Sequence, residues 1–186
     1  MTLVSTFELL FKPQLPKSIT DQDSKLNSIT RNILQGYFLS IANLTETDQL
    51  LNLTVVFTLK TSTKLKKLDL RATLDTNGGN DPVSVEFEEK KDIKKFYFTF
   101  PINPQDTGLF LVQADVLDPE IFKDLNFEER GYVEIFITHT SPSKTAKLLI
   151  TAEHRGTFFG DNKSEAGEVA YALPLASGKS LFELSK

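Results

Sequence analysis

The chain has 186 residues, among which there is no cysteine, no tryptophan and only two histidines. Without cysteine there is no disulfide, no thiolate metal ligand and no cysteine nucleophile. His139 and His154 fall at opposite ends of one predicted hairpin, too far apart to share a metal ion or a proton. No phosphate-binding loop, dinucleotide fingerprint or nucleophile elbow occurs either. We therefore expect no metal, no cofactor and no enzymatic activity.

Long apolar segments and concentrated charge are also absent. No apolar run is long enough to span a membrane, and the first residues lack the basic and apolar regions of a signal peptide. The 21 basic and 25 acidic side chains are interspersed and give a net charge of -4, whereas nucleic-acid-binding proteins usually carry a basic patch. These features predict a protein with no membrane span and no nucleic-acid partner. Its predicted location is the cytoplasm, and export by a non-classical route is the alternative.

Alternation of apolar and polar residues takes the place of helical periodicity, and turn residues recur roughly every eight to twelve positions. Most of the fifteen phenylalanines are expected in the core, because their rings have no polar atom. Together these patterns predict an all-β, antiparallel β-sandwich of about ten to twelve strands, of immunoglobulin-like or jelly-roll character, as a single domain over residues 1–186. Strands are predicted at residues 2–11, 36–43, 50–61, 66–74, 83–88, 93–100, 107–116, 131–139, 145–154, 169–175 and 181–184.

One segment interrupts the alternation. Asp118 is a suitable N-cap, Pro119 suits the first helical position, and Glu120 follows in the first turn. At most one short helical turn is therefore predicted, near residues 118–125.

A four-residue motif, Glu-x-Arg-Gly, occurs twice, at residues 128–131 and 153–156. We interpret the two segments as the arms of one hairpin with its loop at residues 141–144. In this register every pair on one face is apolar, which assigns that face to the core: Ile137 with Leu148, Ile135 with Ile150, and Val133 with Ala152. Arg130 is then predicted to lie directly opposite Arg155 on the outer face.

The predicted arginine pair has three interpretations. Two opposed guanidinium groups are unfavourable unless they are compensated, so the pair belongs either to a solvated network with nearby glutamates, to an anion site for a carboxylate or phosphate, or to a subunit contact. The candidate ligand-binding residues are Arg130, Arg155, Tyr132, Glu134 and Glu153.

Apolar residues on and near the same face are candidates for an interface. Phe136 and Leu149 are predicted to form an exposed apolar pair on an otherwise polar face. Phe158 and Phe159 follow the hairpin, from where they can fold back over that pair. These four residues are our candidate contact residues.

Acidic residues give weaker signals. The segment 75–81 offers Asp75, Asn77, Asn80 and Asp81 as oxygen ligands, but it lacks the spacing of an EF-hand, and a hairpin turn explains it. Catalysis by paired carboxylates is the least favoured function, because 25 acids define no particular pair.

The sequence thus favours a non-enzymatic, self-assembling or scaffold protein that acts through homo-oligomeric contacts or binds another protein, through sheet edges or apolar face residues. The alternative is a ligand-binding or sensing module for a sugar, peptide or anion, which would use the outer face of the 131–155 hairpin.

Overall fold

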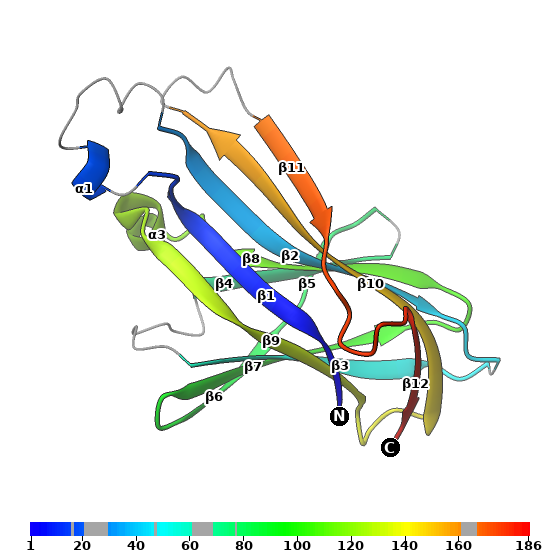
Figure 1. Cartoon of the computed structure of the whole chain (residues 1–186). Helices are drawn as coiled ribbons and strands as arrows, with labels where there is room; N and C mark the ends of the chain where they lie inside the picture. The colour runs from blue at the N-terminus through cyan, green and yellow to red at the C-terminus, as the bar shows by residue number, and fades with distance from the viewer. Residues whose placement is uncertain (16, 21–29, 47, 61–68, 77, 161–166) are drawn as a thin grey trace.

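Antiparallel strands account for most of the chain (Figure 1). The computed structural model describes residues 1–15, 17–20, 30–46, 48–60, 69–76, 78–160 and 167–186. The predicted all-β fold is confirmed. The strands are β1 (Thr2–Pro13), β2 (Asn32–Asn43), β3 (Leu51–Lys60), β4 (Leu70–Asp75), β5 (Asp81–Pro82), β6 (Val85–Lys90), β7 (Ile93–Ile102), β8 (Thr107–Ala114), β9 (Phe127–Ile137), β10 (Thr145–Phe159), β11 (Gly167–Ala172) and β12 (Leu181–Ser185).

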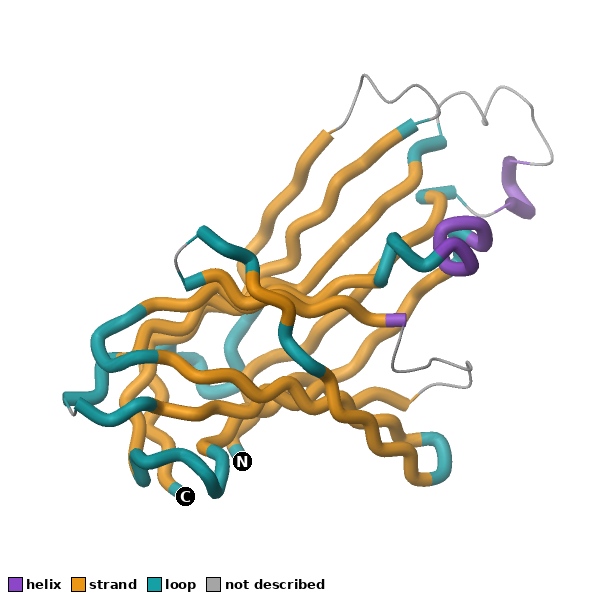
Figure 2. The backbone as a smooth tube through the Cα atoms, turned by 180° about the vertical axis from the view of Figure 1, so that it is seen from behind, coloured by secondary structure: helices purple, strands orange, loops and turns teal. Residues whose placement is uncertain are grey.

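The twelve strands belong to one hydrogen-bonded sheet that curls into two facing layers (Figures 1 and 2). Layer A contains β5, β4, β8, β2 and β10 in spatial order, with β11 and β12 both on the far edge of β10. Layer B contains β1, β9, β3, β7 and β6 in spatial order. The curling gives the sheet an inner face, which is mainly apolar, and an outer face. The outer face meets solvent except along β3, whose outward residues Thr54, Val56 and Thr58 are buried.

The two layers are joined at β2, because one edge of this strand changes its partner along its length. Asn32 to Gln35 pair with β1, whereas Tyr37 to Ala42 pair with β8. The other edge of β2 pairs with β10 throughout. Gly36 stands at the change of partner, where an added Cβ would lie 3.0 Å from the Leu111 side chain. The absence of a side chain at Gly36 therefore permits the close crossing.

The core lies between the layers and is rich in phenylalanine, as predicted. Eight of the fifteen rings are buried: Phe7, Phe11, Phe57, Phe96, Phe98, Phe100, Phe110 and Phe182. Phe57 of β3 shows how the layers meet, since its ring lies 4.8 Å from Phe7 in layer B and 5.3 Å from Tyr37 in layer A. Full burial of one such ring contributes about 1.5–3 kcal/mol.

The predicted helical turn is present as α3 (Pro119–Asp124). Asp118 caps it by accepting a hydrogen bond from the Glu120 N–H at 2.8 Å, and Leu125 ends it in the left-handed conformation. A further short turn, α1 (Lys17–Thr20), was not predicted. Phe122 of α3 packs on Phe11 with ring centres 5.9 Å apart, which holds α3 against the end of β1.

The predicted hairpin between residues 131 and 155 is wrong. β9 pairs with β1 and β3 in layer B, and β10 pairs with β2, β11 and β12 in layer A. The six apolar residues used to set the register are buried, but they enter the core from opposite layers. Alternation identifies the buried face of a strand and not its neighbour, so both arrangements satisfy the same pattern.

Candidate functional site

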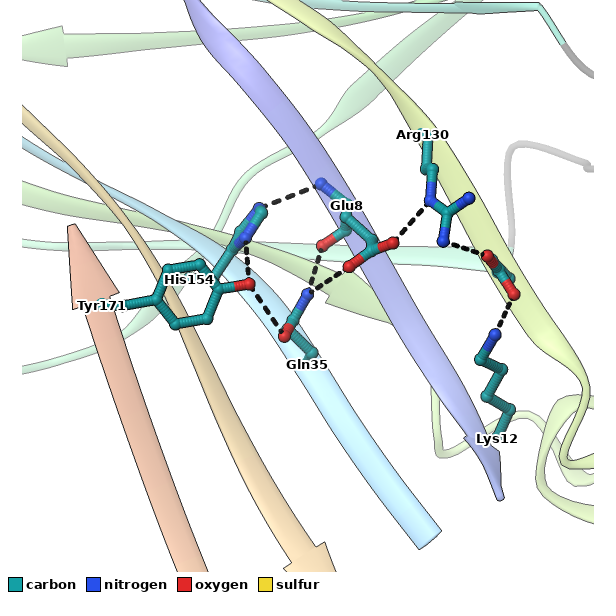
Figure 3. Close-up of polar contacts among 7 residues, drawn as sticks. Glu8, Lys12, Gln35, Arg130, His154 and Tyr171 are labelled. Carbon is teal, nitrogen blue, oxygen red and sulfur yellow. Dashed lines mark hydrogen bonds and ion pairs between the residues drawn. The ribbon is translucent and has the colours of Figure 1, made fainter. Parts of the chain in front are cut away.

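Polar side chains gather where β1 separates from β2, and we call this group the seam network (Figure 3). Its members come from five strands and are Glu8 and Lys12 of β1, Gln35 of β2, Glu128 and Arg130 of β9, His154 of β10, and Tyr171 of β11.

Main-chain groups of Glu8 explain why the network exists. β1 pairs with β2 only from Leu10 onward, so the edge of β1 before that point has lost its neighbouring strand. His154 Nε2 accepts the Glu8 N–H at 2.9 Å, and Gln35 Nε2 donates to the Glu8 carbonyl at 3.2 Å. Buried main-chain groups need such partners, so these two side chains take the place of a strand.

The hydrogen bonds fix the protonation of His154. Its Nε2 is an acceptor, so the neutral ring carries its proton on Nδ1 and donates it to the Tyr171 hydroxyl at 2.9 Å. Tyr171 in turn donates to Gln35 Oε1 at 3.4 Å. Burial lowers the pKa of His154, against the opposing effect of the Glu8 carboxylate.

A row of alternating charges continues the network along the outer face of layer B (Figure 3). Arg130 bridges two carboxylates, with Nε 2.5 Å from Glu8 Oε1 and Nη2 2.6 Å from Glu128 Oε1. Lys12 pairs with the other oxygen of Glu128. The hydrogen bond from Lys12, reinforced by the charges of Lys12 and Arg130, lowers the pKa of Glu128.

These contacts make the seam network a structural device. Both ring nitrogens of His154 are used within the chain, so neither is available to a substrate. The hydroxyl of Tyr37, which lies beside His154, is hydrogen-bonded to Ser5 Oγ at 2.8 Å. Burial raises the pKa of Tyr37. The network therefore closes the gap between the layers, and the outer faces are the remaining candidate functional surfaces.

Arg155 lies on the outer face of layer A, on a strand that does not pair with β9, and so it is not opposite Arg130. Its guanidinium lies 4.6 Å from the centre of the Phe38 ring, and its Nε donates to Glu153 at 2.9 Å. It borders a groove of about 540 Å³ whose lining includes Leu34, Gly36 and Phe38. The predicted paired-arginine site is therefore not formed, and Arg130 and Arg155 each pair with glutamates nearby.

The outer face of layer A carries apolar residues on its central strands, interrupted by Ser40 and Thr151, which are opposite each other. The half-buried or exposed apolar residues that point outward there are Leu34, Phe38, Ala42, Leu109, Leu111, Leu149 and Leu181. We call this set the apolar face. Leu149 and Leu181 are opposite each other on β10 and β12 and are 45% and 43% exposed. Leu149 was one of the predicted contact residues.

The other predicted residues fall elsewhere. Tyr132, Glu134 and Phe136 lie on the outer face of layer B, opposite Thr58, Val56 and Thr54 of β3. Phe136 and Leu149 therefore belong to different layers and do not form a pair.

Phe158 and Phe159 also fail to cover that predicted pair, because they end β10 beside Ile33 and Asn32 of β2. Phe159 stacks on Phe11 with ring centres 6.1 Å apart. The Phe159 ring therefore packs at the end of the sandwich, against β1.

Sequence reasoning missed Gln35 and His154 as seam residues, although a signal was present. Both stand at inward positions in otherwise apolar series, with Ile33 and Tyr37 around Gln35, and Ile150 and Ala152 before His154. A polar residue at an inward position predicts a buried hydrogen-bond partner. Glu8 and Tyr171 carry no such signal, because their role depends on which strands meet.

No family model matches the chain, and no curated protein matches it. Within the described ranges, no cluster of three or more potential metal ligands occurs. Asn77 lies outside those ranges, and Asp75 accepts a hydrogen bond from the Gly78 N–H, as a turn residue does. No helix in the described part of the chain is long and apolar enough to cross a membrane.

Proposed function

We propose that this chain is a non-enzymatic assembly protein that self-associates through the apolar face of layer A. The observation that carries the proposal is the contrast between the two outer faces. Layer A presents Leu149 directly opposite Leu181, with Phe38 opposite Leu111 on the neighbouring strands β2 and β8. On layer B the exposed Leu3 and Tyr132 stand next to charged residues, Glu134 and Arg130. Exposed apolar patches on one side of a sandwich mark protein contacts.

Charges around the apolar face favour a second copy as the occupant. Arg155 and Lys147 project from the same face of β10 as Glu153, and Glu183 projects beside Lys147 on β12. A surface with both signs can oppose a rotated copy of itself with unlike charges together, whereas a surface of one sign would repel its copy. On the same face, the Arg155 guanidinium packs on the Phe38 ring. This contact holds the ring in place before a second copy binds.

Light scattering after size-exclusion chromatography tests the proposal on the wild-type chain and on Leu149→Glu. Placing a carboxylate in an apolar contact used by both copies should weaken association about 10-fold or more. Tyr132→Glu is the matched control, because Tyr132 is 41% exposed but lies on layer B. A wild-type chain that stays monomeric at high concentration, or equal association in both variants, contradicts the proposal.

The alternative function is a ligand-binding or sensing module for a sugar, peptide or anion on the outer face of the 131–155 hairpin. It is less well supported, because β9 and β10 do not pair and so do not bring the two arginines together. Arg155 alone borders the groove, and its side chain is occupied by Glu153 and Phe38. We therefore favour assembly over anion binding.

A further inference from the structure

β11 (Gly167–Ala172) forms a margin of layer A, visible as the outer strand beside β10 in Figure 1. It pairs with β10 along one edge, from Phe158 opposite Gly167 to Glu153 opposite Ala172. Among the described residues, no strand pairs with its other edge. Such an edge offers a row of main-chain donors and acceptors to another strand.

The pairing with β10 determines which groups of β11 point outward. Leu173 continues the ladder by donating its N–H to the Ala152 carbonyl at 2.8 Å. In an antiparallel pair, residues alternate between those that bond the neighbour and those whose groups point away. Tyr171 and Val169 therefore bond β10, while the N–H and C=O groups of Glu168, Ala170 and Ala172 point away from it.

Other margins of the sheet carry the protection that β11 lacks. β6 has Glu86, Glu88, Glu89 and Lys90 among its six residues. β5 is two residues long and ends in Pro82. Charges, prolines and short length are the usual means of blocking edge pairing. β11 has one charged residue, Glu168, and alanines at its two other outward-bonding positions.

We propose that β11 pairs antiparallel with β11 of a second copy across a two-fold axis at Ala170. In this register Ala170 faces Ala170 of the second copy, and Glu168 faces Ala172. Every outward N–H then meets an outward C=O, because the three outward residues of one strand face those of the other. Layer A continues from one copy into the next with its apolar face on the same side.

The side chains of β11 suit this register. Glu168 lies opposite alanine, so the two carboxylates are kept apart, whereas a shift that placed the axis at Glu168 would oppose them directly. On the inner face, Val169 lies opposite Tyr171 of the second copy. Tyr171 is 44% exposed, and a β-branched residue across from an aromatic ring is a favourable cross-strand pair. A self-complementary strand makes a second copy the fitting partner.

We call the proposed pairing of two β11 strands the edge contact, and the proposed association through the apolar face the face contact. The edge contact rests on the proposed function in one respect, since both contacts require a second copy of the chain. The two contacts use different surfaces, the apolar face and the margin of layer A, so they can be separated by substitution.

A single introduced thiol tests the register, because the chain has no cysteine of its own. In the Ala170→Cys variant, the two introduced cysteines would face each other across the two-fold axis. Directly opposed residues of a hydrogen-bonded pair have Cα atoms about 5.5 Å apart, which a disulfide can span. Mild oxidation should give a covalent dimer on a non-reducing gel. Glu86→Cys, on the charged margin β6, is the matched control and should remain monomeric on that gel. Equal dimer yields from the two variants overturn the proposal.

Ala170→Pro is the second arm. It removes an N–H that points outward and leaves the ladder with β10 intact, so the fold should survive by circular dichroism while association weakens about 10-fold or more. Oligomers that persist unchanged in Ala170→Pro, without cross-linking of Ala170→Cys, overturn the edge contact alone. Association abolished by Ala170→Pro but unaffected by Leu149→Glu overturns the face contact alone, and a monomeric wild-type chain overturns both.

Discussion

Gly131 and Gly156 are the last residues of the two Glu-x-Arg-Gly motifs. We expect opposite effects on stability when each is replaced by alanine. A Cβ on Gly131 would lie 2.1 Å from the Thr58 carbonyl oxygen and 2.9 Å from the Phe7 ring. A Cβ on Gly156 would find its nearest neighbours, side-chain atoms of Ile33 and Val169, at 3.4 and 3.5 Å. The first position is blocked by main chain and the second has ordinary contact room.

The magnitudes follow from these distances. Contacts between carbon and a carbonyl oxygen are normally about 3.3 Å or longer, so Gly131→Ala must move β9 and β3 apart by more than ~1 Å. Gly131 pairs with Phe7 on one side and Leu59 on the other, so neither neighbour can yield alone. We expect a loss of ~3 kcal/mol in the free energy of unfolding. Gly156→Ala should be neutral or stabilising by ~0.5–1 kcal/mol, because alanine restricts the unfolded chain.

Urea unfolding followed by far-ultraviolet circular dichroism measures both variants against the wild-type chain. A shift of ~3 kcal/mol also lowers the midpoint of thermal unfolding by roughly 6–12 °C in a chain of this size. Comparable losses in the two variants would refute the close-approach argument, because the glycines would then matter only as general features of the strand. A stable Gly131→Ala protein would show that β9 and β3 are further apart than described.

Further predictions concern the buried polar groups. The free energy of unfolding should fall as pH drops below about 6.5, because the unfolded chain then binds a proton that His154, with its lowered pKa, resists. His154→Gln should flatten this dependence between about pH 5 and 7, and the control His139→Gln, an exposed residue, should retain it in urea titrations. Thr58→Val should raise the free energy of unfolding by ~1 kcal/mol, because the Thr58 hydroxyl is buried with no hydrogen-bond partner among the described residues; a loss of stability would contradict this.

Strand positions and buried faces could be predicted from the sequence, because both depend on local alternation. Thr2 is the predicted and observed start of β1, and Ile93 of β7. The capping of α3 by Asp118 was predictable for the same reason. Such features need no knowledge of what packs against the segment.

Strand partners could not be predicted in this way. The motif at residues 128–131 and 153–156 suggested a hairpin, yet the connection between β9 and β10 passes from one layer to the other. The seam network depends on those partners, since Glu8 needs His154 only because β1 has separated from β2. Arg130 was recognised as a charged site, but its main partner, Glu8, is distant in sequence.

The shared strand β2 has a consequence for the order in which the chain assembles during synthesis. Its partners lie in residues 2–13, 107–114 and 145–159. The edge of β2 that pairs with β10 therefore stays unpaired until about a hundred more residues have been synthesised. At ~5–20 residues per second, the apolar strand spends roughly 5–20 s without its longest neighbour. Long-range pairing of this kind slows folding. The nascent chain is therefore most exposed to aggregation, and most in need of chaperone cover, before β10 leaves the ribosome.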